Sequence, residues 1–207
     1  MFLGWAFTAL SSHAAILSNG SFETGDFTGW VTQTAAGDNL SVQQSLATHG
    51  LFSAQSFFDA EGPATTFIAQ DIGVLAGGST LTFDYETEVY DIFGPPGGGG
   101  DRVFSLTLRP NGGGTPIHTF EIWRALSGQS TVSGPQSASL DLSAYAGQSV
   151  RLSFETFIPG FTTGPGSFKL DHVALTAVPE PATCGLIAGA GLVGFAVWRR
   201  RGSKAQA

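Results

Sequence analysis

The sequence predicts an all-β domain, an antiparallel sandwich of the jelly-roll type, followed by a single C-terminal transmembrane helix. Short segments rich in β-branched and aromatic residues alternate between apolar and polar positions, which indicates half-buried strands. Gly, Ser, Pro and Asp separate these segments, and the chain of 207 residues holds 29 Gly and 17 Phe. One uncharged apolar run lies near the C-terminus, and no other segment has a convincing helical period.

Nine segments have the strand pattern. The clearest is 80–89, where ten residues alternate, and the segments 104–108, 117–123 and 150–157 alternate likewise. Further strands are expected at 40–46, 51–58, 65–72, 136–142 and 166–176. Eight or nine short antiparallel strands joined by loops are typical of a sandwich or a jelly roll.

The N-terminal residues 1–14 have the features of a secretory signal peptide. Phe2 to Leu10 is apolar, and Ser12-His13-Ala14 places small residues at both ends of a cleavage tripeptide, so cleavage is expected after Ala14. The basic n-region is missing and the apolar region is short. We therefore expect the signal to begin upstream of Met1; the alternative is a buried first strand.

The other end of the chain predicts a membrane span at 184–198. Residues 182–198 hold no charge, and these 17 residues would form about 25 Å of helix, the short end of what crosses a bilayer core of about 30 Å. The basic stop Arg199, Arg200 and Arg201 and the tail 202–207 should stay cytoplasmic. The alternative is a buried C-terminal helix of a soluble domain.

A proline-rich segment, 178–183, precedes this span. Pro179 and Pro181 fix their own φ and keep the residue before each of them out of the α region, so Pro179-Glu180-Pro181 should be extended. Followed by a glycine-rich span and an arginine cluster, residues 178–201 closely resemble the PEP-CTERM sorting signal of Gram-negative bacteria. The resemblance implies cleavage near Pro179-Glu180-Pro181 by a membrane transpeptidase of the exosortase type. It also implies delivery to the envelope or to exopolysaccharide, with a role in biofilm or matrix.

Between the two ends, residues 15–177 are expected to form one ectodomain with its own core. They hold 15 of the 16 Asp and Glu residues but only five of the nine Lys and Arg, a net charge of −10. Such an acidic body argues against a nucleic-acid partner, because phosphates need a basic surface. The only cysteine is Cys184, so the ectodomain can form no internal disulfide.

Three further segments, 19–30, 140–154 and 168–175, resemble the opening, the late turn and the last strand of galactose-binding-like jelly rolls. Many carbohydrate-binding modules belong to that family. The resemblance implies that the first and last strands are neighbours with a structural calcium beside them, and Asn19, Glu23 and Asp171 are the matching oxygen donors. The alternative is that these residues only cap turns. Trp30 is expected in the core.

Surface aromatic residues are the candidates for contact with sugars, because a flat ring with polar groups around it suits them. Tyr90, Phe93 and Trp123 are the best of these, since they lie near strand ends beside the glycine-rich loop 94–101. Asp84, Glu86 and Glu88 share one face of a strand. That face is either solvated or a site for a cation or sugar hydroxyls.

Nothing in the sequence gives positive support to catalysis, and no catalytic residue is predicted. No Gly-x-Ser-x-Gly motif is present, His49, His118 and His172 lack metal-ligand spacing, and no pair of carboxylates is fixed in the way a glycosidase needs. We expect an exported, non-enzymatic protein associated with polysaccharide, first anchored in the inner membrane with its C-terminus in the cytoplasm. The alternatives are a structural surface protein without a glycan ligand and, with less support, a polysaccharide-acting enzyme.

Overall fold

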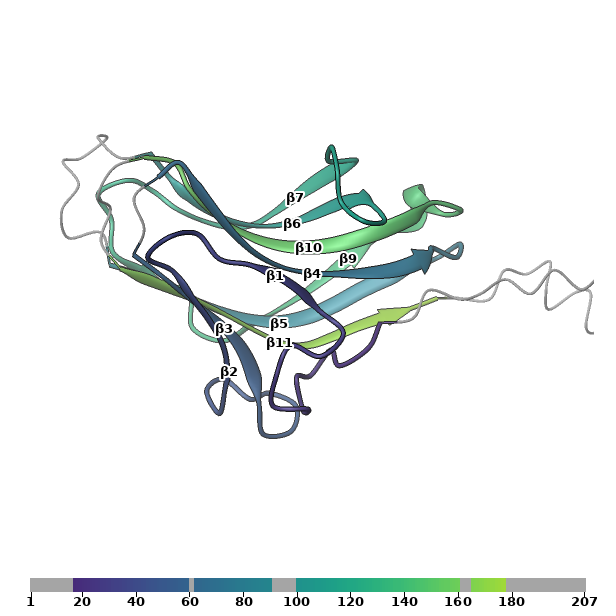
Figure 1. Cartoon of the computed structure of the whole chain (residues 1–207), viewed down its shortest axis with the longest axis horizontal. Helices are drawn as coiled ribbons and strands as arrows, with labels where there is room; N and C mark the ends of the chain where they lie inside the picture. Colours follow the sequence, from purple (N-terminus) through teal and green to yellow (C-terminus); the bar gives the residue numbers. More distant parts are fainter. Residues whose placement is uncertain (1–16, 60–61, 91–99, 161–164, 178–207) are drawn as a thin grey trace, which may run out of the picture.

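The computed structural model describes residues 17–59, 62–90, 100–160 and 165–177, which form two antiparallel sheets packed face to face (Figure 1). In chain order the strands are β1 (Val31–Gln33), β2 (Asn39–Gln43), β3 (Ser53–Phe58), β4 (Ala64–Val74), β5 (Thr80–Val89), β6 (Arg102–Pro110), β7 (His118–Ala125), β8 (Thr131–Val132), β9 (Gln136–Asp141), β10 (Ser149–Ile158) and β11 (Gly166–Thr176). A single 3-10 turn, η1 (Ser143–Tyr145), joins β9 to β10 within the described ranges. The predicted two-layer antiparallel sandwich is confirmed.

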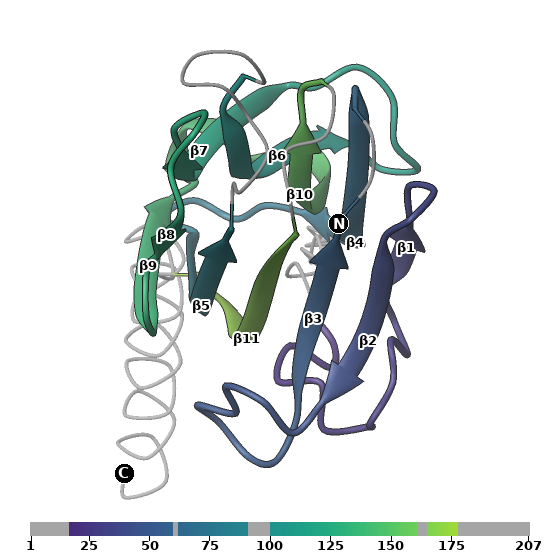
Figure 2. The same ribbon diagram turned by 90° about the vertical axis from the view of Figure 1, so that its left-hand side faces the viewer.

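The five-stranded sheet has the order β1-β4-β10-β6-β7. The six-stranded sheet has the order β2-β3-β11-β5-β8, and β9 also pairs with β5; Figure 2 shows β2, β3, β11 and β5 side by side. Each of the nine predicted strand segments overlaps one of these strands. Only β1 and β8 were not predicted, because segments of three and two residues are too short for an alternating pattern.

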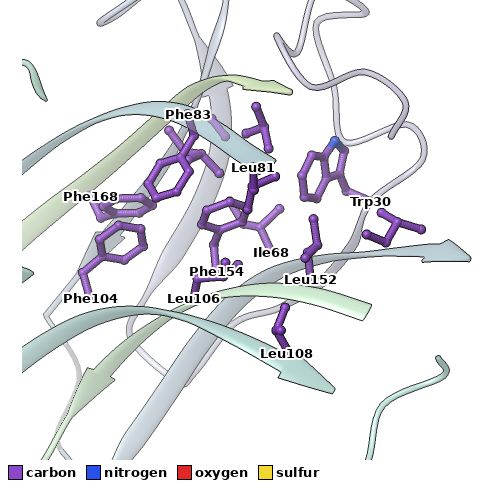
Figure 3. Close-up of a cluster of buried hydrophobic side chains, with 14 of the residues drawn as sticks. Trp30, Ile68, Leu81, Phe83, Phe104, Leu106, Leu108, Leu152, Phe154 and Phe168 are labelled. Atoms are coloured by element: carbon purple, nitrogen blue, oxygen red, sulfur yellow. The ribbon is translucent and has the colours of Figure 1, made fainter. Parts of the chain in front are cut away.

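Alternate residues of the long strands fill the space between the sheets. On β5, Leu81 and Phe83 are buried, whereas Asp84 points away from the core, as the period of two predicts. The Phe154 ring of β10 lies at the centre of this core, with its centroid 5.1 Å from Phe83 in an edge-to-face arrangement, and Leu152 is buried beside it (Figure 3). Burying each such side chain stabilises the fold by roughly 1.5–3 kcal/mol.

The opening segment is tied to the last strand. Val173 of β11 donates a backbone hydrogen bond of 2.9 Å to the Gly20 carbonyl, and a Cβ on Gly20 would lie 2.0 Å from the Val173 oxygen. Only glycine fits at such a close approach. Trp30 stacks on Phe22 with ring centroids 5.4 Å apart, and its indole N–H donates to the Asn19 carbonyl. The prediction that Trp30 belongs to the core is confirmed, since it is 7% exposed.

Several predicted features lie outside the described residues. They are the signal peptide 1–14, Phe93, the segment 178–183, the span 184–198 and the basic stop 199–201. Within the described ranges, no helix has the length and apolarity that a membrane crossing requires.

Candidate functional site

The outward face of the five-stranded sheet is concave. Strands β4, β6 and β10 bow toward the other sheet near their middles (Figure 1). An open groove of about 300 Å³ lies on this face. Its lining is contributed by β1, β4, β6, β10 and the turn after β6, and consists of Gln33, Thr65, Phe67, Arg109, Gly113, Gly114, Arg151, Ser153 and Glu155.

Two phenylalanines supply the apolar part of this face. Phe67 of β4 lies opposite Glu155 of β10, and Phe157 of β10 lies opposite Thr65 of β4. The two residues are therefore diagonal neighbours across a strand pair, with Cα atoms about 7–8 Å apart. Phe157 is 39% exposed, so this face offers an open aromatic surface next to polar groups.

Two arginine–carboxylate pairs supply the charged part. Arg109 donates from Nε to Glu155 Oε1 at 3.0 Å and from Nη2 to Oε2 at 3.2 Å. Arg151 donates from Nε and Nη2 to the two oxygens of Asp71, both at 2.8 Å. Such two-point pairs hold both planar groups in a fixed orientation. The hydrogen bonds from Arg151 lower the pKa of the Asp71 carboxyl below its usual value, although partial burial opposes this.

Small hydroxyl side chains form the floor between these groups. Ser105, Thr107 and Ser153 point outward by strand parity, yet each is at most 6% exposed because longer neighbours cover it. The Thr107 and Thr119 hydroxyls lie 3.3 Å apart. Rings, fixed charges and hydroxyls on one concave surface are suited to bind a polyhydroxylated ligand. The Glu155 and Asp71 carboxylates, each held by an arginine, are placed to accept hydrogen bonds.

The predicted sugar contacts lie elsewhere. Tyr90 follows β5 in the six-stranded sheet and is 45% exposed. Trp123 lies on β7, in register with Phe104, and packs against the core. The two side chains thus belong to different sheets, and their roles stay predictions.

Sequence reasoning missed Phe67, Phe157, Arg109, Arg151 and Glu155 as members of one site. The signal was present in part, because the predicted strands 65–72 and 150–157 put alternate residues on one face. The partner strand and its register decide which residues become neighbours, and these come from a pairing between segments about 80 residues apart.

The predicted calcium donors hold backbone amides in the structure. Asp171 is fully buried, and its Oδ2 accepts from the amides of Thr48 and His49 at 2.7 and 2.9 Å. Glu23 Oε1 accepts from the backbone amides of residues 51 and 52, both at 2.9 Å. Asn19 Oδ1 accepts from the Thr24 amide at 3.4 Å, and Asn19 Nδ2 donates to the Thr24 hydroxyl at 2.8 Å.

The three donors have separate hydrogen-bond partners. Among the described residues, no group of three or more His, Cys, Asp or Glu side chains is placed to hold a metal. Calcium at Asn19, Glu23 and Asp171 stays a prediction.

Two of the three acidic residues on the outward face of β5 have hydrogen-bond or ion-pair partners in the part of the chain that the structure describes. Asp84 accepts hydrogen bonds of 2.6 Å from both Thr48 and Ser137, and Glu86 forms an ion pair of 3.0 Å with Lys169. Burial raises the pKa of Asp84, but these hydroxyls and the adjacent His172 outweigh it and bring the pKa below its usual value. Glu88 lies further along, beside Tyr90.

Among the described residues, the histidines belong to no group of three or more His, Cys, Asp or Glu side chains that could hold a metal. His49 and His172 stack with ring centroids 4.7 Å apart, and His118 lies on β7 against Phe120 and Tyr145. The two stacked rings come from segments that sequence spacing could not connect.

Comparison with known proteins gives two findings. Residues 177–201 match the PEP-CTERM protein-sorting motif, in agreement with the predicted signal at 178–201. The fold is similar to TmCBM61, solved in complex with β-1,4-galactotriose, with a TM-score of 0.53 and 16% identity over 79% of this chain and 99% of that one.

A second solved structure, from a study of promiscuous carbohydrate-binding modules of the β-sandwich superfamily, has a TM-score of 0.52 at 16% identity. That similarity covers 80% of this chain and 64% of the other. At such identities the likeness concerns the fold alone. No curated protein matches the sequence.

Proposed function

We propose that this chain, which carries a PEP-CTERM sorting motif after a β-sandwich with the fold of carbohydrate-binding modules, is exported and binds extracellular polysaccharide without acting on it. The observation that carries the proposal is the concave face of the five-stranded sheet. There the rings of Phe67 and Phe157 lie beside the fixed pair of Arg109 and Glu155.

The chemistry of this face matches that of a sugar. The C–H groups of a pyranose ring stack on an aromatic side chain, whereas its hydroxyl groups need donors and acceptors at fixed positions. The guanidinium groups of Arg109 and Arg151 place hydrogen-bond donors on this surface. The carboxylates of Glu155 and Asp71 place acceptors there. Because the side chains are already held by one another, binding would order few additional groups.

The first ligands to test are neutral β-linked oligosaccharides. TmCBM61 was solved with β-1,4-galactotriose, which makes galactan fragments a reasonable starting probe for a chain of the same fold. The acidic body, with 15 Asp and Glu against five Lys and Arg in 15–177, disfavours polyanionic glycans.

The sorting motif gives the second part of the proposal. It supports cleavage near Pro179-Glu180-Pro181 by an exosortase-type transpeptidase, after insertion of 184–198 in the inner membrane with Arg199 to Arg201 in the cytoplasm. The jelly-roll ectodomain would then reach the envelope or the matrix, including exopolysaccharide or biofilm. Glu180→Ala should leave uncleaved protein in the membrane of the native host. Normal processing and release of that variant would contradict the sorting proposal.

Calorimetric titration of the mature protein with a panel of neutral oligosaccharides tests glycan binding. We expect Phe67→Ala with Phe157→Ala to weaken binding at this face by at least about tenfold, the equivalent of about 1.4 kcal/mol. Leu126→Ala is the matched control, because Leu126 is also exposed, at 50%, but does not line the groove.

Two outcomes would change the assignment. Absence of binding to every glycan would favour the structural surface protein. Release of soluble products from a polysaccharide would favour an enzyme.

A further inference from the structure

We infer that the domain has a second glycan-binding site, on the outward face of the six-stranded sheet at Phe57 and Tyr90, and that it cross-links two polysaccharide chains. The inference rests on the proposed function, because it assigns a second site for the same class of ligand. The inference has a different consequence from the proposed function. A protein with one site only coats a polymer, whereas a protein with two opposed sites can join two polymer chains.

The exposure of aromatic side chains points to this place. Among the Phe, Tyr and Trp residues that the structure describes, three are more than 36% exposed: Phe57 and Tyr90 at 45% each, and Phe157 at 39%. Phe157 lies on the concave face already described. The other two meet at one groove of about 340 Å³ on the opposite sheet. Most other aromatic side chains in these ranges are buried in the core or packed against it, so this exposure is selective.

The groove is built across three paired strands. Phe57 of β3 is in register with Ser167 of β11, and Ser167 is in register with Glu88 of β5. Ser167 is 6% exposed and forms the floor between the ring and the carboxylate. Tyr90 donates a backbone hydrogen bond of 2.9 Å to the Pro165 carbonyl, which fixes the start of the adjoining segment. Sheet hydrogen bonds therefore hold these groups in place.

Polar side chains that can form further hydrogen bonds lie around the two rings. Gln55 and Glu88 line the groove, and their side chains have no hydrogen-bond partner among residues 17–59, 62–90, 100–160 and 165–177. An amide both donates and accepts, and a carboxylate accepts. Next to them, Lys169 and Glu86 neutralise each other in an ion pair. The remaining charge is negative, which favours a neutral polysaccharide over an anionic one.

The two grooves open in opposite directions. One is lined by residues of the five-stranded sheet and the other by residues of the six-stranded sheet. These two sheets pack face to face (Figure 1). Sheets pack about 10 Å apart, and outward side chains add to this separation. A short oligosaccharide bound in one groove cannot occupy the other, so the two sites bind different chains or distant parts of one chain. Two linked weak sites also hold a polymer more strongly than either alone.

The test combines stoichiometry with cross-linking on the mature protein, using a neutral oligosaccharide and its parent polymer. Calorimetry should give two oligosaccharides per protein. Phe57→Ala with Tyr90→Ala should give one, and the protein should lose its ability to make the polymer solution turbid while still binding it. Tyr90→Phe, which keeps the ring, should retain both properties. Thermal melting of each variant checks that the fold is intact.

The outcomes separate this inference from the proposed function. One oligosaccharide per protein, lost in the Phe67→Ala and Phe157→Ala variant, would overturn the second site and leave the proposed function standing. If the wild type binds one oligosaccharide and the Phe57→Ala and Tyr90→Ala variant binds none, both the cross-linking and the assignment of the concave face would be overturned. Two oligosaccharides unaffected by the Phe57→Ala and Tyr90→Ala variant would also overturn the site proposed here.

Discussion

Replacing Asp171 with Asn should destabilise the domain strongly, although the two side chains have nearly the same shape. The Asp171 carboxylate is 0% exposed and accepts four hydrogen bonds. Oδ2 receives those from the Thr48 amide at 2.7 Å, the His49 amide at 2.9 Å and the Thr48 hydroxyl at 3.1 Å, and Oδ1 receives that from the His172 amide at 2.6 Å. The side chain thereby ties the connection between β2 and β3 to the last strand.

The size of this destabilisation follows from the number of side-chain oxygens that can accept hydrogen bonds. Asn keeps one oxygen, so if it replaces Oδ2, the His172 amide faces an NH₂ group and loses its partner. The other three hydrogen bonds become neutral, and a bond to a charged group contributes about 1.5–3 kcal/mol against about 0.5–1.5 kcal/mol for a neutral one. Together these losses come to roughly 4–7 kcal/mol. Asn no longer buries a charge, which offsets part of them, so we expect a net loss of about 2–4 kcal/mol in the free energy of unfolding. For a domain of this size that lowers the Tm by about 4–16 °C.

Urea unfolding followed by tryptophan fluorescence measures this loss. Asp141→Asn is the matched control, because it removes the same charge from an exposed residue whose oxygen caps Ser143 at 2.8 Å, a role that Asn also fills. The control should change stability by less than about 0.5 kcal/mol. If Asp171→Asn were no more destabilising than Asp141→Asn, the carboxylate would not hold the loop as the hydrogen bonds indicate.

Three further predictions concern the core, the concave face and calcium. Phe154→Ala should lower the unfolding free energy by about 3–5 kcal/mol in a urea titration, because it empties the centre of the sandwich; a loss below 1 kcal/mol would contradict that placement. The pKa of Asp71 is lowered in the folded state, so its pair with Arg151 stabilises the fold above the unfolded pKa of about 3.9 and ceases to do so as pH falls through the folded value. The free energy of unfolding of the wild type should therefore exceed that of Asp71→Asn by less than about 1 kcal/mol at pH 6. The difference should vanish at a pH below the folded pKa of Asp71, and a difference that grows as the pH falls would refute the assignment. If Asn19, Glu23 and Asp171 bind calcium, adding it to chelator-treated protein should raise the Tm, and an unchanged Tm would reject the site.

Strand positions and the direction of side chains could be predicted because they depend on local pattern. The ten-residue alternation at 80–89 placed Phe83 inward and Asp84 outward, and the structure has both in that arrangement. Trp30 was expected in the core for another reason, the resemblance of the segment 19–30 to the opening of galactose-binding-like jelly rolls. The short strand β8 exists only because two of its residues meet Glu88 and Val89 of β5, and no local signal could reveal it.

The sequence by itself determined the class of fold, the strand segments, the acidity of the ectodomain and the PEP-CTERM sorting motif, because each is carried by residues close together in the chain. Tertiary structure alone decided which residues lie together on each outward face. Phe67 and Phe157 become neighbours through the pairing of β4 with β10, and Phe57 meets Tyr90 where β3, β11 and β5 lie side by side. A period of two tells which face a residue occupies, but the partner strand and its register, which depend on the whole core, decide what lies next to it.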